Sequence, residues 1–166
     1  MKQKLLLFIC VLLAGVPAYA QIVGKSPIPE IKISFKRCIV EGDGAYIDVL
    51  ITNTSAKSCR FAFDYGDNGL SIYDDEGNVY NNAHVSQIAD YKVYPTIGDE
   101  RIVGTTEIPA GISQKVRIVI ANRFNEYAAG LQLVSINFSW DAFGTRDYGN
   151  YRTGKFELRD LPVIRD

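Results

Sequence analysis

The chain contains little of the chemistry that enzymes and metal sites use most often. It has one histidine, His84, with three cysteines and one tryptophan among 166 residues. A hydrolase triad needs a base beside its nucleophile, and no Gly-x-Ser-x-Gly motif accompanies this histidine. A lone loop histidine is more often solvated than catalytic, and zinc needs several Cys or His ligands at close spacing. We therefore predict that the protein is not an enzyme and needs no cofactor.

The chain also lacks a hydrophobic run long enough to span a membrane. Its most apolar stretch, Leu5 to Val16, has 12 residues, whereas a membrane-spanning helix needs about 20. A basic start precedes this run, and Ala18-Tyr19-Ala20 then offers small residues at the two positions that a signal peptidase reads. We predict that residues 1–20 are a signal peptide cleaved after Ala20. The protein would then be secreted or periplasmic, with no membrane insertion after cleavage.

A strong charge of either sign is missing as well. Removing residues 1–20 leaves 16 Lys and Arg against 19 Asp and Glu, and the two signs are mixed along the chain. Nucleic-acid binding needs a clustered basic face, which this pattern does not show, so we predict no nucleic-acid partner. The remaining 146 residues suffice for one domain with a hydrophobic core. We expect an extended lead-in over 21–29 and a single domain over 30–166.

Short segments with alternating apolar residues fill most of this domain. Ile31, Ile33 and Phe35 alternate with polar neighbours, and the same period of two recurs around Ile47 and Ile118. Turn residues separate such segments at a spacing of roughly 8–12 residues, which is typical of an antiparallel two-sheet β-sandwich of about 8–9 strands. A barrel is the less favoured alternative. We expect strands near 31–40, 46–52, 59–64, 70–73, 79–80, 102–107, 115–120, 131–140 and 155–161, with one or two helical turns at 122–130.

Two cysteines remain after the predicted cleavage, Cys38 and Cys59. In an oxidising compartment such a pair usually forms a disulfide. If the strands followed one another as a plain meander, Cys38 would lie opposite Ile47 and Cys59 opposite Ile51. The two thiols would then be two strands apart, beyond the ~7 Å Cα separation that a disulfide tolerates. Whether Cys38 and Cys59 are bridged therefore stays open from the sequence.

Acidic residues gather in a turn between two short expected strands. Asp74, Asp75 and Asn78 carry the oxygen atoms that calcium prefers, which makes them weak calcium candidates. Their spacing does not match an EF-hand loop, however. Asp, Asn and Gly are also the residues that tight turns use, because they tolerate positive φ and bond their own backbone. We favour turn formation here and predict no metal.

An aromatic loop near the C-terminus is the most suggestive candidate for binding. Flat rings there could stack on a sugar while polar neighbours bond its hydroxyls, and protein interfaces use the same residue types. Trp140 also continues the apolar face of the strand before it, so burial in the core is the favoured interpretation of this side chain. The speculative ligand-binding residues are Trp140, Asp141, Arg146, Tyr148, Asn150 and Tyr151.

Four turn-and-strand segments together form a recognisable pattern: Ile51–Ser55, Asp74–Tyr80, Ile108–Gly111 and Phe156–Val163. They resemble the immunoglobulin-like β-sandwich domains of small secreted bacterial proteins, many of them of unknown function. The resemblance covers most of residues 30–163 and implies an immunoglobulin-like sandwich. It also implies adhesion, assembly or ligand binding at the cell envelope, and it carries over no catalytic residue.

Two functions are compatible with these observations. The first is a non-enzymatic secreted or cell-envelope module for protein interaction or assembly, which would bind through exposed loops or a sheet edge. The alternative is a carbohydrate-binding module that uses the loop from Trp140 to Tyr151. The expected partner is accordingly a protein or a glycan outside the cytoplasm.

Overall fold

A computed structural model describes residues 21–63, 69–81, 83–88, 91–92, 106–121, 123–141 and 152–165 of the chain. The predicted signal peptide, residues 1–20, lies outside the described residues. Within the described ranges the regular elements are all strands. They are β1 (Ile31–Glu41), β2 (Gly44–Asn53), β3 (Cys59–Phe63), β4 (Leu70–Asp74), β5 (Ala83–Ile88), β6 (Tyr91–Lys92), β7 (Thr106–Ile108), β8 (Ser113–Ile120), β9 (Gly130–Trp140), β10 (Arg152–Pro162) and β11 (Ile164–Arg165).

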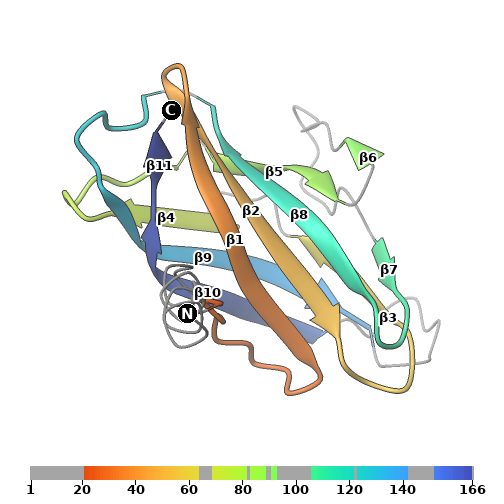
Figure 1. The fold of residues 1–166 in the computed structure, drawn as a ribbon. Helices are drawn as coiled ribbons and strands as arrows, with labels where there is room; N and C mark the ends of the chain where they lie inside the picture. The colour runs from red at the N-terminus through yellow and green to blue at the C-terminus, as the bar shows by residue number, and fades with distance from the viewer. Residues whose placement is uncertain are drawn as a thin grey trace, which may run out of the picture.

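The strands form two sheets that pack face to face (Figure 1). The six-stranded sheet has the order β11-β1-β2-β8-β5-β6, and the five-stranded sheet contains β10-β9-β3-β7 with β4 also paired to β9. Every pairing between these strands is antiparallel except that of β1 with β11. The predicted two-sheet β-sandwich is thereby confirmed, with 11 strands in the described ranges where 8–9 were expected.

The core lies between the sheets and is built by the predicted alternation. Ile33, Ile47 and Ile118 are each fully buried, as are their apolar neighbours at the same period on β1, β2 and β8. The five-stranded sheet contributes an aromatic group in which the Phe138 ring lies 3.8 Å from that of Phe156 and 5.5 Å from that of Phe61, measured between centroids. Because successive strand residues face opposite sides, the same alternation leaves the polar positions on the two outer faces.

A plain meander, the condition under which the two cysteines were placed above, does not apply at the end of β2, where the chain crosses to the other sheet. Buried Asn53 directs this crossing: its Nδ2 donates to the carbonyls of Lys57 at 2.7 Å and Ile108 at 2.9 Å. Its Oδ1 accepts from the backbone N–H of Ser55 at 3.0 Å. Cys59 consequently does not lie opposite Ile51 but pairs with Ile108 on β7.

The helical turns expected at 122–130 are also not found among the described residues of that segment, which form an irregular loop. Arg123 has a φ of 59°, outside the helical region, and the backbone N–H of Phe124 donates to the carbonyl of Asp43 at 2.8 Å. The Phe124 ring stacks on Tyr80 at 5.2 Å. These contacts with other strands override the weak local preference for helix.

Two short segments from opposite ends of the described chain cover the free edge of β1. In the lead-in, the N–H of Gly24 donates to Ile33 at 2.8 Å, and Lys25 exchanges backbone hydrogen bonds with Glu157 on β10. A side chain at Gly24 would lie 2.6 Å from the Glu157 carbonyl oxygen, so only glycine fits there. Further along, β11 pairs with β1 at Ile39. Through the bonds of Gly24 and Lys25, the lead-in connects β1 of one sheet to β10 of the other.

No helix in the described part of the chain is long and apolar enough to cross a membrane.

Replacing Phe138 by Ala should destabilise the sandwich strongly, because the ring is 1% exposed and contacts three other rings. We expect the free energy of unfolding to fall by about 3–5 kcal/mol, as for other buried Phe to Ala changes. Urea denaturation followed by fluorescence measures this loss. As a control, Tyr127→Ala removes a ring that is 77% exposed and should stay within about 0.5 kcal/mol of the wild type. Equal losses in the two variants would contradict the assigned core.

Candidate functional site

The residues singled out in the aromatic loop divide into two groups in the structure. Trp140 and Asp141 are described and are 7% and 2% exposed. Arg146, Tyr148, Asn150 and Tyr151 lie outside the described residues, and their role in sugar binding stays a prediction. The Trp140 ring stacks on Phe138 at 5.0 Å, in the core position favoured from the strand pattern.

Asp141 has a structural role in this arrangement, and its predicted part in ligand binding stays a prediction. Its Oδ1 accepts the backbone N–H of Arg60 at 2.8 Å, and its carbonyl lies 3.5 Å from the Cys59 sulfur. This hydrogen bond connects the residue that follows β9 to the backbone of β3. Trp140 and Asp141 both expose little surface.

The acidic turn is held by internal hydrogen bonds. Buried Asp74 accepts from the N–H groups of Glu76 and Asn78 at 3.0 and 2.8 Å, from the Asn78 amide at 2.9 Å and from the Tyr80 hydroxyl at 2.6 Å. Burial would raise the Asp74 pKa, but these bonds outweigh it and lower the pKa. Both carboxylate oxygens already have protein donors, which favours the turn over calcium.

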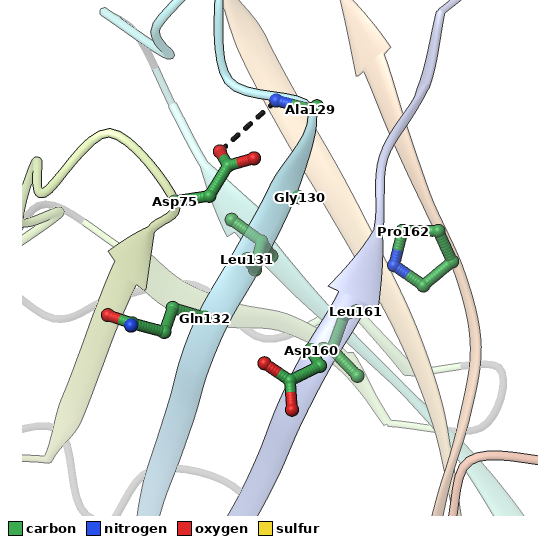
Figure 2. A pocket seen from close by; sticks show the side chains of 8 residues that line it. All are labelled: Asp75, Ala129, Gly130, Leu131, Gln132, Asp160, Leu161 and Pro162. Carbon is green, nitrogen blue, oxygen red and sulfur yellow. Dashed lines mark hydrogen bonds between the residues drawn. The ribbon is translucent and has the colours of Figure 1, made fainter.

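A hollow of about 370 Å³ lies beside this turn, and Asp75 and Asp160 on β10 are both among the residues that line it (Figure 2). Asp75 already accepts the N–H of Ala129 at 3.1 Å. No group of three or more potential metal ligands of the His, Cys, Asp and Glu types occurs in the described part of the chain. The hollow is lined by Asp75, Ala129, Gly130, Leu131, Gln132, Asp160, Leu161 and Pro162.

The two cysteines are free thiols in opposite sheets. Cys38 on β1 and Cys59 on β3 are both buried. Burial raises the pKa of each thiol to about 12, and the nearby Asp141 adds to the effect at Cys59. A thiol with so high a pKa is a poor nucleophile at neutral pH. The bridge left open from the sequence is not formed in this structure.

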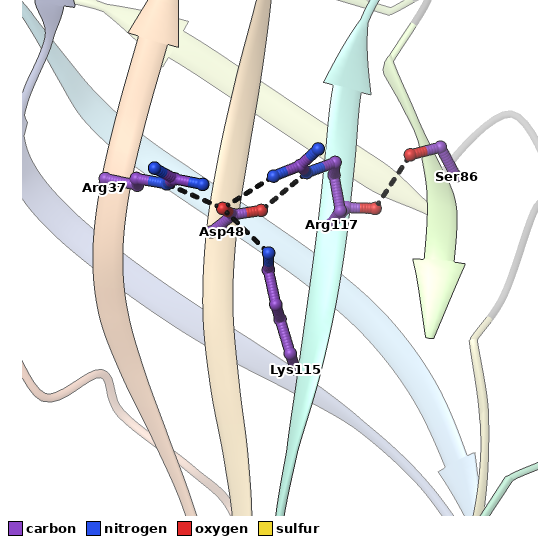
Figure 3. Close-up of polar contacts among 5 residues, drawn as sticks. All are labelled: Arg37, Asp48, Ser86, Lys115 and Arg117. Carbon is purple, nitrogen blue, oxygen red and sulfur yellow. Dashed lines mark hydrogen bonds and ion pairs between the residues drawn. The ribbon is translucent and has the colours of Figure 1, made fainter. Parts of the chain in front are cut away.

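A cluster of charges on the outer face of the six-stranded sheet is the most distinctive polar feature (Figure 3). We call Arg37, Asp48, Lys115 and Arg117 the Asp48 cluster. Asp48 lies on β2 and is 2% exposed. Arg37 on β1 and Arg117 on β8 flank it, since both residues pair with Asp48 in the register of the sheet. The ammonium of Lys115, two residues before Arg117 on β8, lies 3.3 Å from Asp48 Oδ2.

The three cations keep Asp48 ionised. Arg117 binds the carboxylate through two bonds of 2.7 and 2.9 Å, and Arg37 Nε donates to Oδ2 at 2.8 Å. Burial alone would raise the Asp48 pKa, but the hydrogen bonds from Arg117 and Arg37 and the charges of Arg117 and Lys115 hold it well below its usual range. One buried carboxylate therefore fixes three cationic side chains from two strands.

An apolar row runs beside the Asp48 cluster on the same face. The sheet register places Ile39 next to Ile164 and Tyr46, then Val119 next to Tyr46, and His84 next to Val119. Paired residues on neighbouring strands point to the same side. We call these five residues the outer row. Ile164 is 48% exposed, and the other four are half-buried.

A hollow of about 160 Å³ lies where the outer row meets the Asp48 cluster, and we call it the outer hollow. The Arg117 guanidinium carbon lies 5.4 Å from the centre of the Tyr46 ring at this boundary, which is a cation–π distance. Aromatic, aliphatic and arginine side chains therefore meet on one shallow surface. The outer hollow is lined by Arg37, Ile39, Glu41, Tyr46, Asp48 and Arg117.

Sequence analysis alone does not find this face. The signals were present, since Asp48 is an acid in the middle of an apolar strand and Lys115 and Arg117 occupy the polar positions of another. What brings them together is the pairing of β2 with β8, in which Asp48 lies opposite Arg117, 69 residues further along the chain. A long-range register of this kind cannot be derived from local periodicity.

Comparisons with known proteins do not identify the chain. Neither a known protein family nor a curated protein matches it. Among solved structures, it is similar to an ASH/PapD-like domain of human CEP192, with 13% identity, a TM-score of 0.40 and coverage of 91% of this chain and 94% of that one. It is also similar to the GAE domain of GGA2p from Saccharomyces cerevisiae, with 17% identity, a TM-score of 0.40 and coverage of 87% and 99%. At these values neither likeness assigns a function.

The ionised form of Asp48 should stabilise the folded protein. Its pKa in the folded state lies below the ordinary value of 3.8, so protonation of the unfolded chain opposes folding as the pH falls. At pH 7 we expect Asp48→Asn to lower the free energy of unfolding by roughly 1.5–3 kcal/mol, as for a lost charged hydrogen bond. The difference from wild type should shrink below about pH 4. Urea denaturation at pH 7, 5 and 3 measures it, and a difference independent of pH would contradict the ionised cluster.

Both cysteines should be recovered as free thiols. In the native protein at pH 8, we expect iodoacetamide to label Cys38 and Cys59 slowly, because both are buried with pKa values near 12. After unfolding in urea without a reductant, both should react completely. Peptide mapping by mass spectrometry distinguishes the sites. A peptide pair joined through Cys38 and Cys59 in the unreduced digest would contradict the free state.

Proposed function

We propose that this protein is a non-enzymatic, secreted or cell-envelope β-sandwich module that binds a protein partner through the outer face of its six-stranded sheet. The compartment is supported by the basic start, the short apolar run and the small residues of the first 20 positions. The non-enzymatic role is supported by the single histidine and by the buried, high-pKa thiols.

The observation that carries the proposal is the outer row beside the Asp48 cluster. The outer row lines up partly exposed, mainly apolar side chains across five strands, which differs from a single scattered surface hydrophobe. Contiguous apolar patches on a protein surface mark interaction sites. Tyrosine and arginine are enriched at protein interfaces, and Tyr46 and Arg117 meet at the boundary between row and cluster.

The arrangement of the edges also favours a face as the binding surface. Main-chain pairing with a partner needs a free strand edge. The edge of β1 already pairs with the lead-in and with β11. The outer face of the six-stranded sheet, by contrast, is not covered by another layer of strands over β1, β2 and β8 in Figure 1. The sheet-edge mode expected from the sequence is thus unsupported at β1.

Site-directed photo-cross-linking tests the proposal in the cells that produce the protein. A benzoylphenylalanine in place of Tyr46 keeps an aromatic ring in the outer row and should give one discrete adduct of higher mass. Protease digestion of that adduct should release peptides of the partner. The matched control places the same group at Thr153, an exposed residue that pairs with Ser139 in the other sheet. Adducts of equal yield from both positions, or none from position 46, would argue against binding through this face.

A further inference from the structure

The Asp48 cluster carries more positive charge than its carboxylate can neutralise. Arg117 alone pairs with both oxygens of Asp48. Arg37 and Lys115 then share Oδ2 with it, at 2.8 and 3.3 Å. Three cations around one anion leave two positive charges in excess at fixed positions on the surface.

Arg37 is the cation best placed to accept a further anion. It lines the outer hollow, and its side chain is 47% exposed. Among the contacts of the described residues only its Nε donates to Asp48, and its two terminal nitrogens take no part in that bond. A guanidinium offers five N–H donors in a planar fork that matches a carboxylate. Asp48 therefore orients the Arg37 guanidinium but accepts only one of its N–H groups.

Glu41 is the one acid besides Asp48 among the residues that line the outer hollow. Within the described residues it forms no ion pair closer than 4.0 Å with Arg37, Lys115 or Arg117. Glu41 attracts the charge of Arg117 from a longer distance, so it offsets part of the excess positive charge without forming a second salt bridge to the cluster. It also places a negative charge next to the position that an incoming anion would take.

We propose that the partner presents an Asp or Glu side chain that enters the outer hollow and pairs with Arg37, while an adjacent apolar residue of the partner packs on Ile39 and Tyr46. This inference rests on the proposed function and names the chemistry of the partner. A volume of about 160 Å³ fits one side chain, whereas sites for whole small ligands usually measure about 300–1,000 Å³. The apolar row along the hollow gives a protein segment a second contact that a free anion would not use.

The test uses a phage-displayed library of random peptides selected on the immobilised full chain. We expect the enriched peptides to contain an Asp or Glu next to an aliphatic or aromatic residue. Fluorescence anisotropy with the synthetic peptides then gives their Kd. Replacing the acid of the peptide by its amide should weaken binding about tenfold, which corresponds to one charge-assisted contact.

Two variants with opposite expected effects on Kd test whether Arg37 is the residue that binds the acid. Arg37→Gln should weaken binding of the acidic peptides about tenfold. Glu41→Gln should strengthen it, because it removes the repulsion at the hollow without touching the Asp48 bonds. Arg159→Gln, on β10 in the other sheet, removes an exposed arginine of the same charge and should leave Kd unchanged. Thermal unfolding of each variant verifies that the fold is retained.

The possible failures are distinguishable. Peptides without an acid, or acidic peptides that bind Arg37→Gln and wild type equally, would overturn the acidic partner. If the binding of such peptides is still lost in Tyr46→Ala, the proposed use of the outer face survives. If no peptide is enriched, the acidic-segment inference fails, and the cross-linking at position 46 alone decides the proposed function.

Discussion

Asp48 is the residue around which the outer face of the six-stranded sheet is organised. A carboxylate that is almost fully buried has to be matched by cations, because an unpaired charge in that position costs several kcal/mol. The match here comes from β1 and β8, the two strands on either side of β2. The same bonds hold long, flexible side chains in defined orientations, so these side chains lose their conformational entropy during folding. The positions of these charges on the outer face are therefore set by the fold itself.

The two faces of this sheet therefore have different physical bases. The inner face is held by burial of apolar side chains, which is non-directional and tolerates exchange of similar volumes. The outer face depends on directional, charge-assisted bonds whose partners cannot be exchanged freely. Arg37 illustrates the difference, since a lysine there would keep the charge but lose the planar fork. Specificity on this side of the molecule resides in geometry more than in buried area.

The sequence predicts the fold class and most strands because a period of two is a local signal. Ile31, Ile33 and Phe35 are buried as their alternation indicates, and the turns at Gly42 and Gly111 have the positive φ that glycine favours. The pairing of strands is not local. The crossing after β2 depends on hydrogen bonds from Asn53 to Ile108, 55 residues away. Without that contact, a meander is the simpler inference, and it misplaces Cys59.

The candidate site is missed for the same reason. Trp140 is correctly favoured as core because its strand pattern is continuous, whereas Asp141 follows the strand and has no pattern to show that it bonds Arg60. The cluster residues look like ordinary solvent-facing positions when each strand is considered alone. The strand register brings these residues together. Asp48 pairs with Arg37 across a hairpin, whereas it pairs with Arg117 across a long stretch of sequence. Local sequence contains the first pairing and not the second.

The covered edge of β1 has a consequence for how the chain is made. The lead-in at residues 22–25 is available from the start, but the other cover, β11, consists of residues 164–165. Synthesis proceeds from the N-terminus, so the stretch of β1 at residues 39–40 has no partner on that side until residues 164–165 have emerged. An open strand edge invites pairing with other chains. Residues 164–165 thus protect part of the β1 edge, and removing them would leave that edge half-covered.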